Sequence, residues 1–257
     1  MSEVQHHLRC GPGDVAPYVL LPGDPARAEV IASHFDEARQ VAENREYLTF
    51  TGTSGGVPVS VTSTGIGCPS MAIAVEELAR IGVQALIRVG TGGAMQSHLM
   101  PGDLVVATSA VRDEGTSAAY LPRPFPAVAD FDLTWALSEA AEASNRNWHR
   151  GVIHSKDSFY GQKEPERMPV AEELQAKWRA WVRGGALLSE METATLFIVG
   201  AVLGVAAGSI CTVASNDEHG VRLAEGAERE QAIADLTDCA LDAVRRYHDR
   251  RRRGEAS

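Results

Sequence analysis

The sequence predicts an α/β protein, and two observations carry this prediction. Short apolar segments typical of buried strands alternate with longer segments of helical period, and glycine or proline marks most of the junctions. The 257 residues are 44% hydrophobic and 23% charged, which is ordinary for a globular protein with a large buried core. No linker or repeat divides the chain, so we expect a single domain over residues 1–257.

The expected elements follow one another with short connections. The first strand runs into a Pro-Gly-Asp-Pro turn and then a helix, a combination that can cradle an anion. Strands are expected at 18–21, 43–51, 57–64, 85–93, 104–107, 151–155, 186–188 and 205–214. Helices are expected at 26–35, 69–81, 131–143, 170–182, 191–203 and 225–251.

The segment 85–93, ALIRVGTGG, is the most informative part of the sequence. Its apolar run ends in an arginine and three glycines, which predicts a buried strand that stops and turns sharply beside an anion. A guanidinium at Arg88 must be paired there, because an unpaired buried charge costs several kcal/mol. Its partner is either a protein carboxylate or a ligand such as phosphate, for which the neighbouring Thr91 hydroxyl is suited.

The same glycines resemble part of a dinucleotide-binding fingerprint, but the match is incomplete. Met95 stands where the third glycine belongs, and the next strand begins too soon for a crossover helix. We therefore reject a nicotinamide cofactor.

Charge and cysteine content exclude other classes. The formal net charge of −10 argues against a nucleic-acid-binding surface, and the basic run at 250–253 is explained as the end of a helix. The four cysteines lack metal-ligand spacing and are expected to be reduced thiols. With no apolar run long enough for a signal peptide or a membrane span, we expect a cytoplasmic protein.

Six segments together resemble the nucleoside phosphorylases, and most closely their uridine-cleaving branch. In chain order they are LPGDPARAEVIA, NREYLTFTG, TSTGIGCPS, IRVGTGG, KDSFYGQ and SEMETATLF. The resemblance implies a three-layer αβα sandwich around a mixed, partly barrel-like sheet, assembled as a homo-hexamer of three dimers with active sites shared across each dimer. It also implies phosphorolysis of uridine to uracil and ribose 1-phosphate, with inorganic phosphate as co-substrate and no organic cofactor.

The resemblance assigns a phosphate site and a ribose site. Phosphate would be held by Gly23, Arg27, Arg88 and Thr91, with Arg45 from the neighbouring subunit. Taken singly, Arg27 and Arg45 are better explained by surface ion pairs, but the joint pattern reverses this and favours phosphate. Replacing Arg88 by Ala is then expected to abolish phosphate-dependent cleavage and to leave the fold intact.

For the ribose, Glu192 would accept hydrogen bonds from its hydroxyls and Met191 would pack on it, while His7 of the adjacent subunit would reach the 5'-hydroxyl. The structural alternative for Glu192 is a capping box, because Ser189 precedes it by three residues at the start of an apolar helix. A potassium ion contacted by Glu46, Ile66 and Ser70 is also implied by the resemblance alone.

The base pocket is where the sequence departs from its relatives. Phe159 can stack on a base, and Gln162 offers the donor and acceptor that suit uracil. Arg88, Gln162 and Glu192 would thus form the catalytic set. Glu164, however, stands where uridine-cleaving relatives have an arginine, so that Lys156 or Arg167 would have to supply the positive charge.

Alternatives to uridine cleavage remain open at this stage. Purine-cleaving relatives place an aspartic acid at the position of Asn216, where an amide cannot act as a general acid, but Asp217 is adjacent. A purine nucleoside phosphorylase is therefore the nearest competitor. A hydrolytic nucleosidase or a nucleoside-binding protein would have no use for three phosphate-binding arginines.

Overall fold

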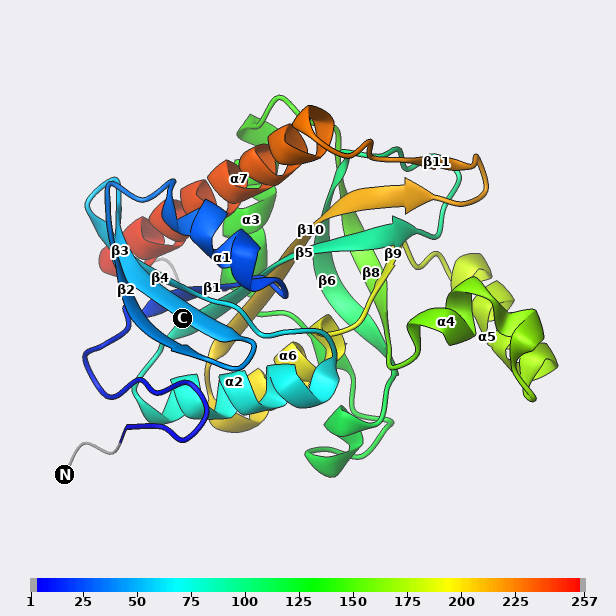
Figure 1. Cartoon of the computed structure of the whole chain (residues 1–257), viewed down its shortest axis with the longest axis horizontal. Helices are drawn as coiled ribbons and strands as arrows, with labels where there is room; N and C mark the ends of the chain where they lie inside the picture. Colours follow the sequence, from blue (N-terminus) through cyan, green and yellow to red (C-terminus); the bar gives the residue numbers. More distant parts are fainter. Residues whose placement is uncertain (1–3, 255–257) are drawn as a thin grey trace.

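The computed structural model describes residues 4–254, and within them one mixed sheet of eleven strands forms the centre (Figure 1). The order of the main path is β11-β10-β6-β8-β9-β5-β1-β4-β3-β2, and β7 pairs with β6. The strands are β1 (Tyr18–Leu21), β2 (Glu37–Asn44), β3 (Tyr47–Ser54), β4 (Val57–Thr62), β5 (Ala85–Ala94), β6 (Leu104–Asp113), β7 (Ala127–Val128), β8 (Trp148–Lys156), β9 (Leu188–Glu190), β10 (Ala206–Asn216) and β11 (Val221–Arg222).

Five of these strands close on themselves. β5 pairs in parallel with β10, β10 runs antiparallel to β6, and β6 pairs in parallel with β8. β9 completes the ring, because it is parallel to β8 and antiparallel to β5. The expected mixed, partly barrel-like sheet is therefore confirmed, with β1 to β4 extending from β5 as an open arm.

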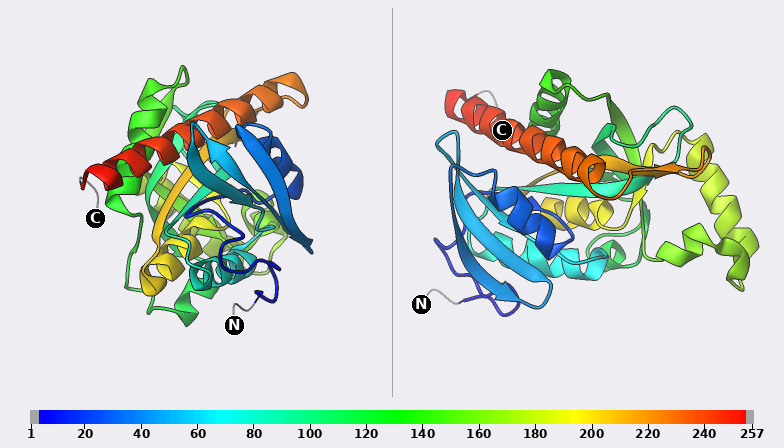
Figure 2. Two further views of the ribbon diagram at one scale, coloured as in Figure 1. Left: turned by 90° about the vertical axis from the view of Figure 1, so that its left-hand side faces the viewer. Right: turned by 45° about the horizontal axis from the view of Figure 1, so that its top comes forward.

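Helices cover both faces of the sheet and make the three layers (Figures 1 and 2). One face carries α1 (Pro25–Ala32), α3 (Phe131–Ala143) and α7 (Ala227–Arg253), and the other carries α2 (Cys68–Arg80) and α6 (Thr193–Leu203). Each side has its own apolar core, so the sheet is buried between them. Outside the layers project the short α4 (Phe159–Lys163) and α5 (Ala171–Arg183), while 3₁₀ turns occur at Thr116–Ala119 and Pro165–Arg167.

The glycine run of β5 does not turn, contrary to expectation. Gly90, Gly92 and Gly93 continue the strand and stay paired with β10. A Cβ atom at Gly90 would lie 2.9 Å from the Arg88 guanidinium and from Cys211 Sγ, and one at Gly92 would lie 2.3 Å from Leu188. These glycines therefore make room for side chains inside a narrow barrel, which only a residue without Cβ allows.

A strand was also missed before the expected strand at 43–51. The structure has two antiparallel strands there, β2 and β3, joined by a turn at Arg45 and Glu46. Arg45 lies in this turn rather than on a strand, with a φ of 57°. β2 is mostly exposed and polar, so it lacks the apolar pattern from which strands are predicted.

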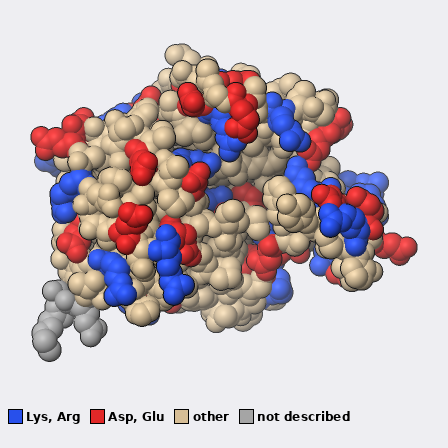
Figure 3. Space-filling model, viewed as in Figure 1, with Lys and Arg blue, Asp and Glu red and all other residues tan. Residues whose placement is uncertain are grey.

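The distribution of charge, the state of the cysteines and the polarity of the helices can be compared with the expectations from the sequence. Acidic and basic side chains are interspersed over the face shown in Figure 3. All four cysteines are buried free thiols. Among residues 4–254, every helix is too short or too polar to cross a membrane.

Candidate active site

Arg88 forms the centre of the site, on the part of β5 that lies inside the barrel. Its side chain is only 5% exposed and pairs with two carboxylates: Nε lies 2.7 Å from Glu190 and Nη2 lies 2.5 Å from Glu192. Burial opposes the charge, but Glu192 and Glu190 outweigh it and raise the pKa of the Arg88 guanidinium. Nη1 is also buried and has no hydrogen-bond partner in the part of the chain that the structure describes.

The two carboxylates differ in how they are held. Glu190 accepts hydrogen bonds from the Ser155 hydroxyl and from the backbone N–H groups of Glu192 and Thr193. Although burial pushes the other way, Arg88 and these donors lower the pKa of Glu190. Glu192 accepts from the Gly67 N–H at 2.5 Å, and burial, aided by the charge of Glu190, raises its pKa.

The capping-box interpretation of Ser189 and Glu192 is wrong. Ser189 lies in β9, and the side chain of Glu192 makes no capping hydrogen bond to α6. Glu190 satisfies the first N–H groups of the helix instead. Glu192 is thereby left free of a structural role at the helix start and faces Arg88.

Arg27 lies in the first turn of α1, immediately after the β1 turn that contains Gly23. It is half-buried and makes no ion pair with any residue described by the structure. Burial lowers its pKa, and the next contribution comes from Arg88, whose positive charge is close by. Two arginines thus face the same region, and Arg27 forms no ion pair with a carboxylate in residues 4–254, although Asp24 offsets part of its charge.

The residues assigned to a neighbouring subunit lie together on another part of the molecule. His7 Nδ1 is 2.7 Å from Glu77, and the His7 carbonyl accepts a hydrogen bond from Asn44, which precedes Arg45. Arg45 is exposed and His7 is partly exposed, so both are accessible from outside.

Of the three residues expected at a potassium site, two are in contact. The Ser70 hydroxyl donates to Glu46 at 2.7 Å, and this hydrogen bond is the main cause of the lowered pKa of Glu46. The Ile66 side chain is 80% exposed.

The base-binding candidates meet at Ser189. Its hydroxyl accepts a hydrogen bond from Lys156 Nζ at 2.8 Å and lies 3.1 Å from Gln162 Oε1. Burial lowers the pKa of Lys156 to about 8, against the opposite influence of Glu190 and Glu192. Lys156 and Gln162 both line a cavity of about 330 Å³ between β8 and α5.

The other two base-site candidates, Phe159 and Arg167, are not among the residues that line this cavity. Phe159 is 49% exposed on α4. Arg167 is exposed and paired with Glu164, and it does not line the cavity, so of the two expected cations only Lys156 reaches Gln162. Asn216 is buried and donates to the carbonyls of Gln96 and Leu99.

Asp217 is exposed and forms an ion pair of 2.6 Å with Lys163 of α4. This pair links α4 to the end of β10 close to Gly93, where Lys163 Nζ approaches to 4.0 Å of an ideal Cβ position. Asp217 therefore lies near the site, but its carboxylate is already engaged.

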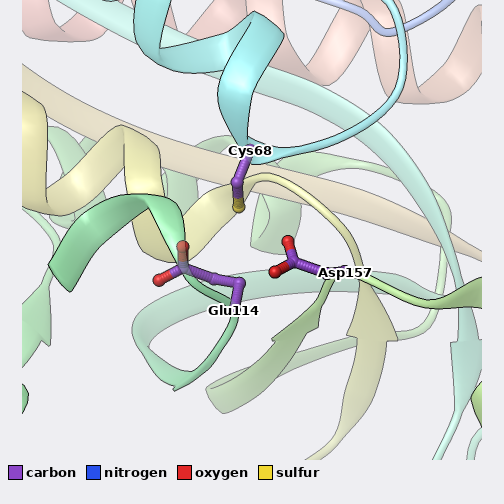
Figure 4. A group of neighbouring side chains, drawn as sticks. All are labelled: Cys68, Glu114 and Asp157. Atoms are coloured by element: carbon purple, nitrogen blue, oxygen red, sulfur yellow. The ribbon is translucent and has the colours of Figure 1, made fainter. Parts of the chain in front are cut away.

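A second group of polar side chains lies beside the site (Figure 4). Cys68, Glu114 and Asp157 point toward one another, with their donor atoms within 4.8 Å. Each is already engaged: Cys68 contacts the Met191 carbonyl, Glu114 accepts from Ser117 and Thr195, and Asp157 accepts from the Gly115 N–H. The group lies where α2 begins and where β6 and β8 end, with Cys68 and Glu114 buried and Asp157 exposed.

Sequence reasoning missed Glu190 and His154. The repeated carboxylates of Ser-Glu-Met-Glu directly after a strand were a signal for a second anion beside Arg88. His154 is 3% exposed and bridges Asp113 and Ser189, a relation that no local spacing reveals.

Comparison with known proteins places this geometry in a family. Residues 17–247 match the family model of the phosphorylase superfamily. A uridine phosphorylase of Treponema pallidum is 49% identical, covering 88% of this chain and 87% of its own, and one of Escherichia coli is 42% identical, covering 78% and 81%.

Two further relatives extend the comparison. A guanosine phosphorylase of Halorubrum lacusprofundi is 40% identical and covers 94% of both chains. The crystal structure of a uridine phosphorylase from Vibrio fischeri superposes with a TM-score of 0.84 at 36% identity, covering 97% of this chain and 98% of its own. The chain belongs to the phosphorylase superfamily.

Proposed function

We propose that this chain is a uridine phosphorylase, a pentosyltransferase that converts uridine and phosphate reversibly to uracil and ribose 1-phosphate. Relatives that bear this name are 40–49% identical over most of their length. The observation that carries the proposal is the juxtaposition of Arg27, which has no ion pair, with the buried Arg88 guanidinium, whose Nη1 has no partner. An anion between them would satisfy both.

Phosphate is the anion that fits this region. Arg27 and Arg88 supply forked donors, Thr91 supplies a hydroxyl, and Gly23 supplies its backbone N–H from the turn between β1 and α1. A Cβ atom at Gly23 would lie 3.0 Å from the Gly65 carbonyl, so the β1 turn packs closely against the loop before α2. This packing keeps the turn in place for phosphate.

The proposed reaction follows from the order in which the site would hold phosphate, ribose and base. Phosphate attacks the anomeric carbon from one face as the bond to the base breaks on the other, which inverts that carbon and forms no covalent enzyme intermediate. Glu192 accepts hydrogen bonds from the ribose hydroxyls beside the Arg88 guanidinium, which opposes the effect of burial on its pKa, and Met191 packs against the sugar. The raised pKa of Glu192 makes this pairing with Arg88 important.

The leaving base needs stabilisation because uracil departs with negative charge. Gln162 supplies hydrogen bonds to its edge, Lys156 supplies the positive charge in place of the missing arginine, and Phe159 stacks on the ring. Lys156 suits this role because it is buried, points at Ser189 next to Gln162, and has a pKa of about 8.

A purine nucleoside is the second candidate substrate, favoured by one observation. The guanosine phosphorylase of Halorubrum lacusprofundi covers 94% of this chain, against 88% and 78% for the uridine phosphorylases of Treponema pallidum and Escherichia coli. In that case Asp217 would have to leave Lys163 to act on the base.

We further propose that His7 and Arg45 complete the site of a neighbouring copy in a hexamer of three dimers. Their grouping beside Glu46 and Ser70 supports a shared contact surface, at which these two residues and Ile66 would also hold a potassium ion.

Product analysis tests the proposed function. Uridine, inosine and guanosine are each incubated with the protein, with and without inorganic phosphate, and the free bases are separated by chromatography. Uracil released only with phosphate is the expected result. Hypoxanthine or guanine as the main product would assign the protein to the purine branch, and base release without phosphate would make it a nucleosidase.

A further inference from the structure

A chain of hydrogen bonds leads from the cavity wall to Gln162. Asp113 lies 3.2 Å from Nε2 of the buried His154, and His154 Nδ1 lies 2.9 Å from the Ser189 hydroxyl. The same hydroxyl contacts Lys156 Nζ at 2.8 Å and Gln162 Oε1 at 3.1 Å. The proposed reaction makes no use of Asp113 or His154, although His154 is only two contacts from the amide that would face the base.

The Ser189 hydroxyl can donate only one hydrogen bond, so its bonds to these three neighbours constrain one another. It has one proton and two lone pairs, and the Lys156 ammonium occupies one lone pair as a donor. The proton and the other lone pair must be divided between His154 and Gln162. The orientation of the Gln162 amide is therefore coupled to the protonation of His154.

Two arrangements meet this condition. A charged imidazole donates to Asp113 and to Ser189, so Ser189 gives its proton to Gln162 Oε1. A neutral imidazole that keeps its proton opposite Asp113 must accept the Ser189 proton at Nδ1. Gln162 must then turn its NH₂ group toward Ser189.

We propose that His154 is a positioning residue whose charge, relayed through Ser189, sets which end of the Gln162 amide faces the base. The proposal rests on the proposed function, which places Gln162 at the base. With Oε1 held by Ser189, the NH₂ group is free to donate to a carbonyl of uracil. With the NH₂ group held, the amide oxygen faces that carbonyl and repels it, so the charged imidazole suits uridine.

The surroundings of His154 contain charges of both signs. The charged groups that line the cavity beside it are Asp113 on β6, Lys156 on its own strand β8, Asp157 directly after β8, and Lys177 and Arg179 on α5. Lys177 lies 3.8 Å from Asp113. Burial raises the pKa of Asp113, but His154 and Lys177 outweigh this and lower it overall. Asp113 therefore stays ionised, so the Nε2 atom of His154 that faces it must carry a proton and donate to it.

The test compares the pH dependence of kcat/KM for uridine in the wild type and in Asp113→Asn, at one fixed phosphate concentration. Loss of the carboxylate removes the acceptor that holds the proton on Nε2, so the step due to His154 moves to lower pH. Ionisation of phosphate and of Lys156 is common to both proteins. Ser189→Ala removes the step, since the relay is gone.

Asp157→Asn is the matched control. Its carboxylate lines the same cavity but accepts from the Gly115 N–H at 2.8 Å and does not contact His154, so the step stays in place. A merely structural role of Asp113 would scale the whole profile without moving its midpoint. Coincident midpoints in wild type and Asp113→Asn would overturn the proposal.

A second measurement separates this inference from the proposed function. If the wild type releases no uracil, the proposed function fails, and ¹H–¹⁵N spectra of glutamine-labelled protein still test the relay. The Gln162 side-chain amide, identified with Gln162→Asn, is expected to shift with the same midpoint as the His154 ring nitrogens, and Ser189→Ala abolishes this response. A Gln162 side-chain amide whose chemical shift does not change as His154 titrates would contradict the relay.

Discussion

The two ends of the candidate site are built from different kinds of structure. At the phosphate end, Arg88 lies on a central strand of the barrel, between two carboxylates that are nearly inaccessible to solvent. At the base end, Phe159 and Gln162 lie on a helix of five residues outside the layers, and Phe159 is half exposed. Under the proposed assignment, bond cleavage would depend on the central barrel, whereas base selection would depend on a peripheral segment.

Relatives named for uridine and for guanosine both align with this chain over most of its length. Under the proposed assignment, a change in α4 or in the residues behind it would alter the base pocket without disturbing the buried ion pairs. Substitutions at the two ends should therefore have different consequences for stability and activity.

Arg88→Ala is expected to have the largest effect, on stability and on activity. It leaves Glu190 and Glu192 buried without a counter-charge, so the free energy of unfolding falls by about 3–5 kcal/mol, and phosphate-dependent cleavage is lost. The sequence-based expectation of an intact fold is thus revised. Chemical denaturation measures the effect, and adding Glu192→Gln should restore part of the stability but no activity. An Arg88→Ala protein of full stability would contradict the buried pairing.

Arg27→Ala should separate activity from stability. Because Arg27 makes no ion pair in the described chain, the melting temperature should change little, while kcat/KM for phosphate falls by about 10- to 100-fold through the lost charged hydrogen bonds. KM for uridine should stay close to the wild-type value. Arg229→Ala, which removes an exposed arginine near Arg27, is the control and should cost less than about threefold. Equal losses in both variants would argue against a specific phosphate contact.

Lys156 makes a pH-dependent prediction at the base end. Its ammonium is present below a pKa of about 8 and is lost above it, so kcat for uridine should decline as the pH rises through that value. Lys156→Met should lower kcat by about tenfold at pH 7 and remove this decline. Rates measured between pH 6 and 10 at saturating phosphate test both points. The same decline in the variant would assign it to another group.

Phe159→Leu should have the smallest effect, because the ring is half exposed and contributes only stacking. KM for uridine is expected to rise by about three- to tenfold at nearly unchanged kcat and stability. Tyr160→Leu on the same helix is the control, since Tyr160 is more exposed and edge-on to Phe159. Indistinguishable KM values for the two variants would place the base elsewhere.

Much of the fold could be predicted because its central strands are apolar and its helices periodic. The exceptions have physical causes. β2 is mostly exposed and polar, with only Val41 and Ala42 packed against the core, and α4 is too short to show a helical period. The glycines of β5 indicated a turn, but they instead make room for Leu188 and Cys211, which come from distant parts of the chain.

The site shows the same division. The motifs pointed to Arg27, Arg88 and Glu192, which the structure gathers around the end of β1 and the barrel. The partners that set their charge were not predictable, because Glu190 meets Arg88 only through the pairing of β9 with β5. The choice of Lys156 over Arg167 likewise depended on burial, which the sequence does not report.

Uracil release from uridine, measured with and without phosphate in the wild type and in Arg27→Ala, tests the account most directly. We expect release that requires phosphate in the wild type. In Arg27→Ala we expect kcat/KM for phosphate to fall by about 10- to 100-fold, while KM for uridine stays close to the wild-type value. Uracil release at the same rate without phosphate, or an Arg27→Ala protein with wild-type phosphate dependence, would contradict the assignment of this end of the site to phosphate.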